Sequence, residues 1–197
     1  MRTVNSEPRW RVAVVDDHEP SRAALRLAVA EAGGELVGEA ERAGDALTTV
    51  GRARPDVAIF AVGLPDGDGV TAAAGVITTA QCPVVLFTSH TDDDLVARAR
   101  AAGVMAYLVK PLRPAELAPT LDLAIARFRE AQALRQTLEE RKVIERAKGR
   151  LMDRLRLSED EAFRRLRRAA MNSRRPMVDV ARAVLVSESV TEGLPAV

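Results

Sequence analysis

The chain has 197 residues, of which 47% are hydrophobic and only 3% are aromatic. Its core must therefore be built from Ala, Val, Leu and Ile, which favours an α/β or all-helical fold and argues against a β-sandwich. The net charge of +1 hides an uneven distribution: residues 1–123 hold 12 Lys and Arg against 17 Asp and Glu, and residues 124–197 hold 17 against 11. An acidic half is joined to a basic half. A polyanion partner for the basic half would explain this, and so would a chance imbalance of solvated faces.

Cysteine usage and the start of the chain bear on the cellular compartment. Cys82 is the only cysteine, which excludes an internal disulfide, and we expect it to be a small packing residue. The apolar run at 12–15 is too short for a signal peptide, and no stretch has the character of a membrane span. We expect a cytoplasmic protein. His18 and His90 have no nucleophile in a recognisable arrangement, so an enzyme is not expected.

Short apolar runs alternate with amphipathic stretches through the first half of the chain. The expected strands cover 11–15, 35–40, 57–61, 84–88 and 106–109, and the expected helices cover 21–32, 44–53, 69–80 and 92–103. This alternation predicts right-handed crossovers and a five-stranded, parallel, doubly wound α/β sheet. Functional side chains should gather where the strands end.

Polar residues do follow three of these strands. Asp16 and Asp17 come after the first, Thr88 ends the fourth and Lys110 follows the fifth. The third strand instead ends in Ala61, just before the loop GLPDGDG. Because the carboxyl ends of parallel strands share one edge, we expect two acids, a hydroxyl and an amine to meet there.

The runs VVDDHEPSR, GLPDGDG, VVLFTS and AYLVKP, in that order and spacing, resemble the receiver domain of bacterial two-component response regulators over residues 10–123. The resemblance implies a flavodoxin-like fold and a pocket in which an aspartate accepts a phosphoryl group, paired acids bind Mg²⁺, a hydroxyl contacts the phosphate and a lysine neutralises it. The acceptor position falls on Ala61. By the same resemblance the other pocket residues are Asp16, Asp17, Thr88, Lys110 and Tyr107, the last being the aromatic residue that moves on activation.

A methyl group cannot form an acyl phosphate, so Ala61 makes this position degenerate. With one carboxylate ligand lost, Mg²⁺ binding at Asp16 and Asp17 should be weak or absent, and no other cofactor is expected. Lys110 should instead contact one of the two acids. We expect a receiver that does not use phosphate as its switch, although Thr88 and Lys110 could equally have purely structural roles.

Two aspartates of the following loop are the alternative acceptors. Asp66 and Asp68 lie close to the acceptor position along the chain. However, Asp68 followed by Gly69 is more simply a helix cap and turn. Phosphorylation at either aspartate is therefore the minor hypothesis.

The stretch from Pro114 to Leu155 contains few helix breakers, which predicts one long helix or two closely joined helices. Leu121, Ile125 and Phe128 keep a packing spacing of four and then three, and Leu134 with Leu138 resumes it out of phase. We therefore expect the connector, residues 124–137, to pair with a second copy. A single buried helix face would give the same pattern.

The last part of the chain should contain two further helices. Ser158, three residues before Glu161, has the spacing of a capping box and predicts a helix start, with Phe163 in the core. A break at 172–176 precedes a third short helix, and residues 188–197 form a tail without periodicity.

Residues 138–187 resemble the ANTAR domain, a three-helix RNA-binding output module of bacterial transcription antiterminators, in the runs VIERAKGRLM, SEDEAFRRLRRAA and VDVARAVL. Arginine hydrogen-bonds phosphates and stacks on unpaired bases, which suits this function. A glycine inside a helix costs about 1 kcal/mol relative to alanine, so a reason for Gly149 is expected, and close approach of another backbone is one. The candidate RNA-binding residues are Arg141, Lys148, Gly149, Arg164, Arg165, Arg168 and Asn172.

We therefore predict an RNA-binding transcription antitermination regulator with an atypical receiver. The expected partners are structured hairpin RNA, a second copy of the chain and a sensor kinase or other signalling protein. Two alternatives remain open. Three short basic helices can also form a DNA-binding helix-turn-helix, and the protein could be an interaction adaptor that binds no nucleic acid.

Overall fold

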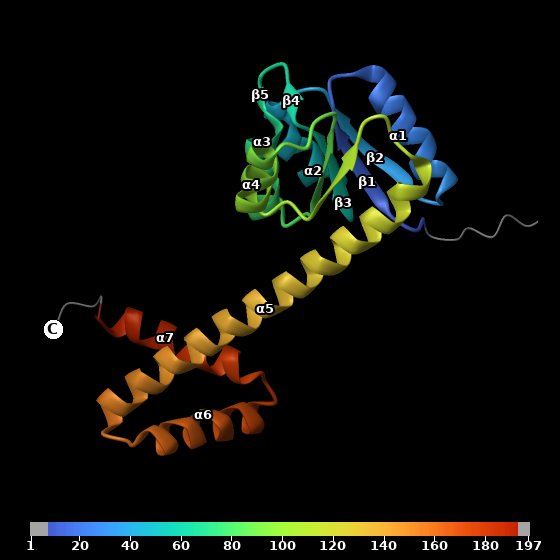
Figure 1. The fold of residues 1–197 in the computed structure, drawn as a ribbon. Coiled ribbons are helices and arrows are strands. Elements are labelled where there is room, and N and C mark those ends of the chain that lie inside the picture. Colours follow the sequence, from blue (N-terminus) through green and yellow to red (C-terminus); the bar gives the residue numbers. More distant parts are fainter. Residues whose placement is uncertain (1–7, 193–197) are drawn as a thin grey trace, which may run out of the picture. The chain divides into compact units, whose positions relative to one another are not determined.

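The computed structural model describes residues 8–192 and divides into two units, one ending at Glu130 and the other starting at Ala131 (Figure 1). Each unit has a hydrophobic core of its own. Within the described part of the chain, no helix combines the length and the apolar character needed to cross a membrane.

A five-stranded parallel sheet forms the centre of the first unit, with the strand order β2-β1-β3-β6-β7. The strands are β1 (Arg11–Val15), β2 (Glu35–Ala40), β3 (Val57–Ala61), β6 (Val84–Thr88) and β7 (Ala106–Val109). All five coincide with the strands expected from the apolar runs. Every residue of β3 and β6 is buried, as the continuous apolar runs of central parallel strands require. A short antiparallel hairpin of β4 (Gly63–Leu64) and β5 (Gly67–Asp68) follows β3.

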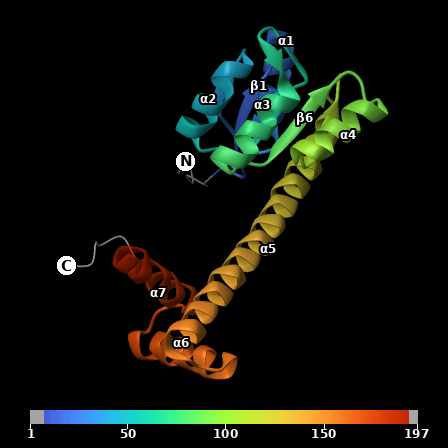
Figure 2. The ribbon, with the colours of Figure 1, turned by 90° about the vertical axis from the view of Figure 1, so that its left-hand side faces the viewer.

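Helices cover both faces of this sheet (Figure 2). Helix α1 (Glu19–Glu31) and the first part of α5 (Pro114–Leu155) pack on one face. The other face is covered by α2 (Ala46–Ala53), α3 (Gly69–Gly75) and α4 (Asp93–Ala102). Two short helices complete the unit, η1 (Ala43–Asp45) and the π-helical turn η2 (Val76–Ala80). Cys82 is buried as expected, and burial raises the pKa of its thiol to about 12.

The loop after β3 closes tightly against the end of that strand. The carboxylate of Asp68 accepts a hydrogen bond from the backbone N–H of Thr71 at 2.9 Å and caps α3, as expected. The N–H of Gly69 donates to the carbonyl oxygen of Val62 at 2.7 Å. A Cβ atom on Gly69 would lie 1.8 Å from the carbonyl oxygen of Ala61, so only glycine fits there.

Trp10 fastens the first part of α5 to the sheet. Its ring is 3% exposed, and its Nε1–H donates to Asp122 of α5 at 2.8 Å. The Arg9 guanidinium lies 4.2 Å from the centroid of the ring and also pairs with Asp122. The backbone of Trp10 meanwhile accepts a hydrogen bond from Glu35 of β2. One residue thus connects the edge of the sheet with α5.

The second unit consists of the remainder of α5 with α6 (Glu159–Ser173) and α7 (Met177–Glu192). Residues 114–155 form a single helix, the first of the two expected arrangements. The predicted capping box is present at Ser158 and Glu161. The core expectation for Phe163 is wrong, because this ring is 38% exposed while Ala162, Leu166 and Ala170 form the buried face of α6. Helix α7 continues to residue 192, into the expected tail, whose last residues, 193–197, lie outside the described part.

The contact at Gly69 predicts that Gly69→Ala destabilises the first unit. The added methyl group would overlap backbone atoms, which cannot move aside as a flexible side chain can, so we expect a loss of about 1–3 kcal/mol or more in the free energy of unfolding. Gly75→Ala at the end of the same helix is the matched control, because a Cβ there meets nothing within 4 Å. That control should stabilise by up to about 1 kcal/mol. Denaturant unfolding of both variants would measure the difference, and equal stabilities would contradict the prediction.

Candidate functional sites

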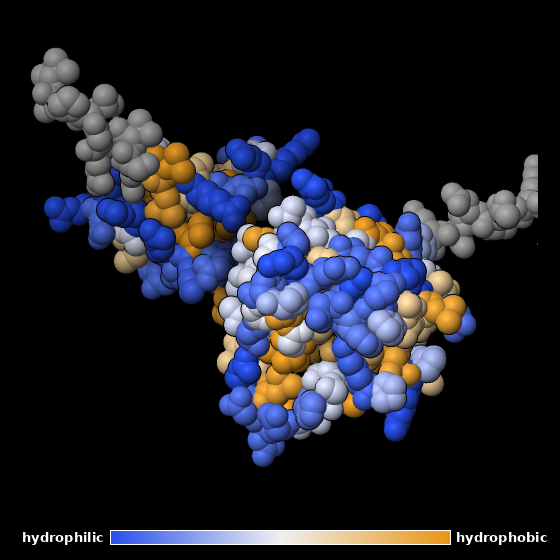
Figure 3. Space-filling view, turned by 90° about the horizontal axis from the view of Figure 1, so that it is seen from above, coloured by the Kyte–Doolittle hydropathy of each residue, from blue (hydrophilic) through white to orange (hydrophobic). Residues whose placement is uncertain are grey.

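The first candidate site lies at the carboxyl edge of the sheet in the first unit. A cavity of about 450 Å³ opens there, and its lining includes Ala61, Thr88, His90, Arg98 and Lys110. Seen from above in Figure 3, the end of this unit that carries the β4–β5 hairpin is mostly hydrophilic. The strand order therefore brings together the ends of β3, β6 and β7, as the sequence predicted.

Asp16 is the buried charge of this edge, with a side chain that is 1% exposed. Lys110 Nζ donates to Asp16 Oδ2 at 2.7 Å, and Asp16 Oδ1 accepts from the backbone N–H of His18 at 2.9 Å. The expected lysine–aspartate contact is therefore present, and each carboxylate oxygen has a partner. The ammonium group of Lys110 also lies 4.9 Å from the centroid of the Phe87 ring.

The residues at this edge do not fit the Mg²⁺ site that the receiver resemblance implies. Octahedral Mg²⁺ needs several oxygen ligands, and the acceptor position offers only the methyl group of Ala61. Asp16 is already engaged by Lys110, which leaves the exposed Asp17 as the remaining carboxylate of the expected pair. Across residues 8–192, no cluster of three or more His, Cys, Asp and Glu side chains is arranged to hold a metal ion.

Thr88 and Tyr107, the two other expected pocket residues, have different environments. Thr88 is 5% exposed, and its hydroxyl donates to the carbonyl oxygen of His90 at 2.8 Å and accepts from the N–H of the same residue at 3.1 Å. This hydroxyl therefore closes the loop after β6. Tyr107 lies on β7 and is 50% exposed.

Both alternative acceptors are engaged in structural contacts. Asp66 accepts hydrogen bonds from the N–H groups of Ala43 and Gly44 at 2.7 and 3.0 Å, and the Gly44 contact is the main reason that its pKa lies below the ordinary value. Asp68 caps α3 and pairs with Arg98 at 2.7 Å. Burial alone would raise the pKa of Asp68, but the bonds from Thr71 and Arg98 outweigh it and hold this pKa low. Both carboxylates thus have roles in holding the loop.

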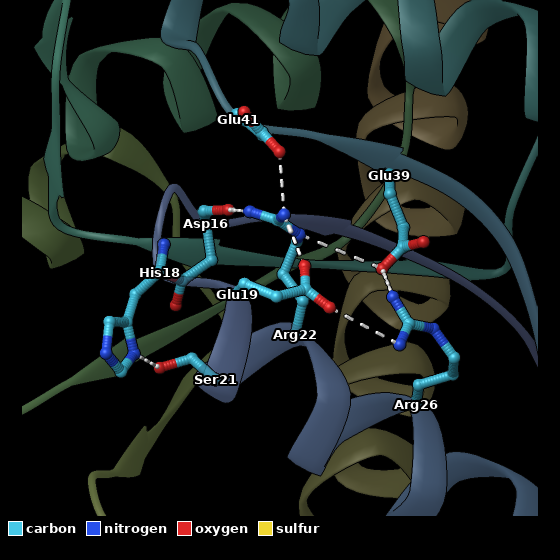
Figure 4. A network of polar contacts seen from close by, with 8 residues as sticks. All are labelled: Asp16, His18, Glu19, Ser21, Arg22, Arg26, Glu39 and Glu41. Carbon is cyan, nitrogen blue, oxygen red and sulfur yellow. Dashed lines mark hydrogen bonds and ion pairs between the residues drawn. The ribbon is translucent and has the colours of Figure 1, made fainter.

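Arg22 is an important residue of this edge that sequence reasoning missed. It is 7% exposed, and its guanidinium donates to the carbonyl oxygen of Asp16 at 2.7 Å and to Glu41 at 2.6 Å (Figure 4). It also contacts Glu19, and Arg26 beside it pairs with Glu39. The network anchors the backbone that carries the two acids to α1 and to the end of β2. A signal was available, since Arg22 lies three residues before the buried Leu25 on the inner face of α1.

The second candidate site is a groove of about 590 Å³ along α6, which we call the arginine groove. Its lining residues are Leu157, Glu161, Arg164, Arg165, Arg168, Ala169 and Asn172. They repeat every three to four residues along the helix, so they share one face. Four of the seven candidate RNA-binding residues, Arg164, Arg165, Arg168 and Asn172, are therefore brought together.

The other three candidates do not line the groove. Arg141 is exposed on α5, and Gly149 is half-buried at a point where a Cβ would meet nothing within 4 Å. Packing within the chain therefore does not explain the glycine. Lys148 is 8% exposed, and its ammonium group contacts Glu159 at 2.8 Å and Glu145 at 2.9 Å. Hydrogen bonds to these carboxylates raise the pKa of Lys148.

The parallel sheet with a lysine–aspartate contact at its carboxyl edge, followed by a basic helical unit, defines a signalling regulator of the receiver type. Residues 12–122 match the response regulator receiver domain, and residues 132–185 match the ANTAR domain. The chain thus belongs to the response regulators that combine a receiver domain with a C-terminal ANTAR domain. Its site and fold can be set beside several relatives.

Among sequence relatives, the transcriptional regulatory protein PdtaR of Mycobacterium tuberculosis is 40% identical over 182 residues, covering 89% of each chain. The DNA-binding transcriptional activator DevR/DosR of the same species is 37% identical over 55% of this chain and 51% of its own. The signal receiver domain of a modulated diguanylate cyclase from Desulfovibrio desulfuricans is 26% identical, with a TM-score of 0.58 over 62% of this chain and 98% of that one. Chemotaxis protein CheY4 of Vibrio cholerae is 29% identical, with a TM-score of 0.54 over 58% and 97%.

The Lys148–Glu159 contact predicts a pH dependence of stability in the second unit. The hydrogen bond from Lys148 holds the pKa of Glu159 below its ordinary value, so the stabilisation is present above that ordinary value and is lost as the pH falls through the lowered one. Glu159→Gln should therefore lower the melting temperature at neutral pH and have little effect once the pH lies below the lowered pKa of Glu159. Melting followed by circular dichroism across pH would show this, and a deficit that persists in acid would contradict it.

Proposed function

We propose that the protein is a cytoplasmic, RNA-binding transcription antitermination regulator whose receiver does not use phosphorylation as its switch. The observation that carries the proposal is the arginine groove, which lies inside the segment that matches the ANTAR domain. Stabilising a hairpin in a leader transcript, so that a terminator does not form, is the activity implied by the family resemblance.

The chemistry of the groove suits RNA. The side chains of Arg164, Arg165 and Arg168 offer planar donor groups for phosphate oxygens, and Asn172 adds an amide that can pair with a base edge. Leu157 and Ala169 contribute apolar surface on which an unstacked base could rest. Sequence-specific RNA recognition commonly targets such unpaired bases in loops. The DNA-binding relative DevR/DosR matches 55% of this chain, and the segment that carries the arginine groove matches the ANTAR domain. The ANTAR match favours the RNA function over the DNA-binding alternative.

The receiver pocket supports a phosphate-independent state. Ala61 offers no atom that can accept a phosphoryl group, and Lys110, the residue that would neutralise phosphate, is already paired with the buried Asp16. Asp66 and Asp68 hold the loop by their own hydrogen bonds. The buried Asp16 of the unmodified receiver therefore has its charge paired within the chain, and a sensor kinase or other signalling protein would act on the receiver by binding alone.

A homodimer through α5 is the arrangement that we propose for RNA binding. Within the second unit, Leu134 and Leu138 of this helix are 63% and 48% exposed at a spacing of four. Gly149 lies on the same side of the helix by the 3.6-residue period, with open space around it. A second helix could approach closely there, and two linked RNA-binding domains would raise the effective concentration of the second contact.

Ala61 predicts that the protein takes up no phosphoryl group from acetyl phosphate and Mg²⁺, as measured by intact-protein mass spectrometry. Ala61→Asp restores a carboxylate at the end of β3 and should gain the mass of a phosphoryl group under the same conditions. A mass increase in the unmodified sequence, mapped to Asp66 or Asp68, would instead establish a relocated acceptor. The RNA affinity of the unmodified protein should not change with the phosphodonor.

RNA binding is tested with a two-hairpin RNA and a duplex DNA of equal charge across a salt series. We expect preference for the RNA and about ten-fold weaker binding for Arg165→Ala, because a charge-assisted hydrogen bond is lost. Arg167→Ala is the matched control, since this exposed arginine of the same helix does not line the groove. Equal effects of the two substitutions would place the contact elsewhere. Preference for DNA would support the DNA-binding alternative, and indifference to both would support the adaptor.

A further inference from the structure

Few contacts determine how α6 lies on the second part of α5. Only residues 156–158 connect the two helices, and Arg156 among them has a left-handed backbone with φ of 54°. To the hydrophobic cluster of this unit α6 contributes Leu166, whereas the other described members, buried or partly buried, lie on α5 and α7. The other buried residues of α6 are Ala162 and Ala170. Alanine side chains are short and offer little shape for fixing one helix against another. A directional contact between α5 and α6 therefore has a large share in setting their arrangement.

Lys148 provides such a contact. From α5 its ammonium group reaches Glu159, the first residue of α6, at 2.8 Å, and a second carboxylate on its own helix, Glu145, at 2.9 Å. The lysine side chain is 10% exposed, whereas the two glutamate side chains are 68% and 64% exposed. Phe163 of α6 lies over the same lysine, with its ring centroid 6.0 Å from Nζ. The ammonium group of Lys148 thus contacts two residues of α6, Glu159 and Phe163.

We propose that Lys148 is a positioning residue that fastens α6 to α5 through Glu159 and so holds the arginine groove in its binding arrangement, without contacting RNA itself. The inference rests on the proposed RNA-binding function. The proposal assigns different roles to two basic residues that are both RNA-binding candidates by sequence. Arg165 lines the groove, whereas Lys148 does not.

The charges around Lys148 argue against a phosphate contact. Two carboxylates within 3 Å leave its immediate surroundings with a net negative charge. A phosphate would have to displace both of them, and their side chains are far more exposed than that of the lysine. In the groove, by contrast, the printed contact of Arg164 is from Nε to a carbonyl oxygen, that of Asp160, at 3.3 Å. Ion pairs on exposed surfaces contribute little on their own, but a mostly buried ammonium group that bridges two helices restricts their geometry.

The two roles predict opposite effects for Glu159→Gln. If Lys148 contacts RNA, removing Glu159 frees the lysine and strengthens binding. If Lys148 positions α6, the same substitution weakens binding. Asp160→Asn is the matched control, because it removes the same charge at the next position of α6 without a contact to Lys148. This control reports the general electrostatic effect of losing one acid near the RNA.

We expect Lys148→Met and Glu159→Gln each to weaken binding of the two-hairpin RNA by roughly three- to ten-fold relative to Asp160→Asn, and the double variant to be no weaker than either. The slope of log affinity against log salt should stay unchanged in Lys148→Met, whereas loss of a phosphate contact would reduce it by about one unit. Tighter binding by Glu159→Gln, or a reduced slope in Lys148→Met, would overturn the positioning role.

Hydrogen exchange of the α6 amides in the full chain separates this inference from the proposed function. Lys148→Met and Glu159→Gln should each speed exchange in α6 by roughly three- to ten-fold, with no further increase in the double variant, while Asp160→Asn leaves it unchanged. If the unmodified protein binds no RNA, the proposed function is wrong. The exchange rates of the single and double variants still test whether Lys148 and Glu159 act together in holding α6 on α5. Additive effects, or no effect on α6, would overturn the inference whether or not RNA binds.

Discussion

The buried carboxylate of Asp16 is the constraint on which the organisation of the receiver unit depends. A charge removed from water is stable only when it is paired and hydrogen-bonded, and Lys110 and the N–H of His18 supply both partners. Arg22 holds the carbonyl oxygen of the same residue. The ends of β1 and β7 and the start of α1 are therefore joined at one point. With Ala61 in place of an acid, the ammonium group of Lys110 pairs with the buried carboxylate of Asp16.

Much of the receiver fold and its edge could be predicted from the sequence. The features that could not be predicted were missed for a common reason. The five strands follow from short apolar runs between helix and strand breakers. The Lys110 contact was expected because Asp16 and Asp17 remain at this edge while Ala61 replaces the third acid. The spacing to Leu25 places Arg22 on the inner face of α1, but two of its partners, Glu39 and Glu41, come from β2 and the residue after it. No local spacing reveals those long-range contacts. The break of the expected 69–80 helix into α3 and a π-helical turn likewise has no signal in the apolar pattern.

In the second unit, too, the sequence did not reveal contacts between residues of different elements. In sequence, Lys148 and Arg165 are two positive residues in adjoining helices. The turn after α5 places Glu159 against the lysine, and the capping box at Ser158 fixes where α6 begins. Phe163 was expected in the core as part of the apolar face of α6, yet Ala162, Leu166 and Ala170 form the buried face and the Phe163 ring is 38% exposed.

Trp10 gives the molecule a built-in optical reporter. It is the only tryptophan of the chain, so the intrinsic indole emission arises from a single place. The ring is buried between the sheet edge and α5, and its Nε1–H donates a hydrogen bond to Asp122. Any event that loosens α5 from the receiver would expose the indole to water and shift its emission to longer wavelength, whereas changes confined to α6 and α7 would leave the spectrum alone. Movement of the shared helix can thus be followed without attaching a label.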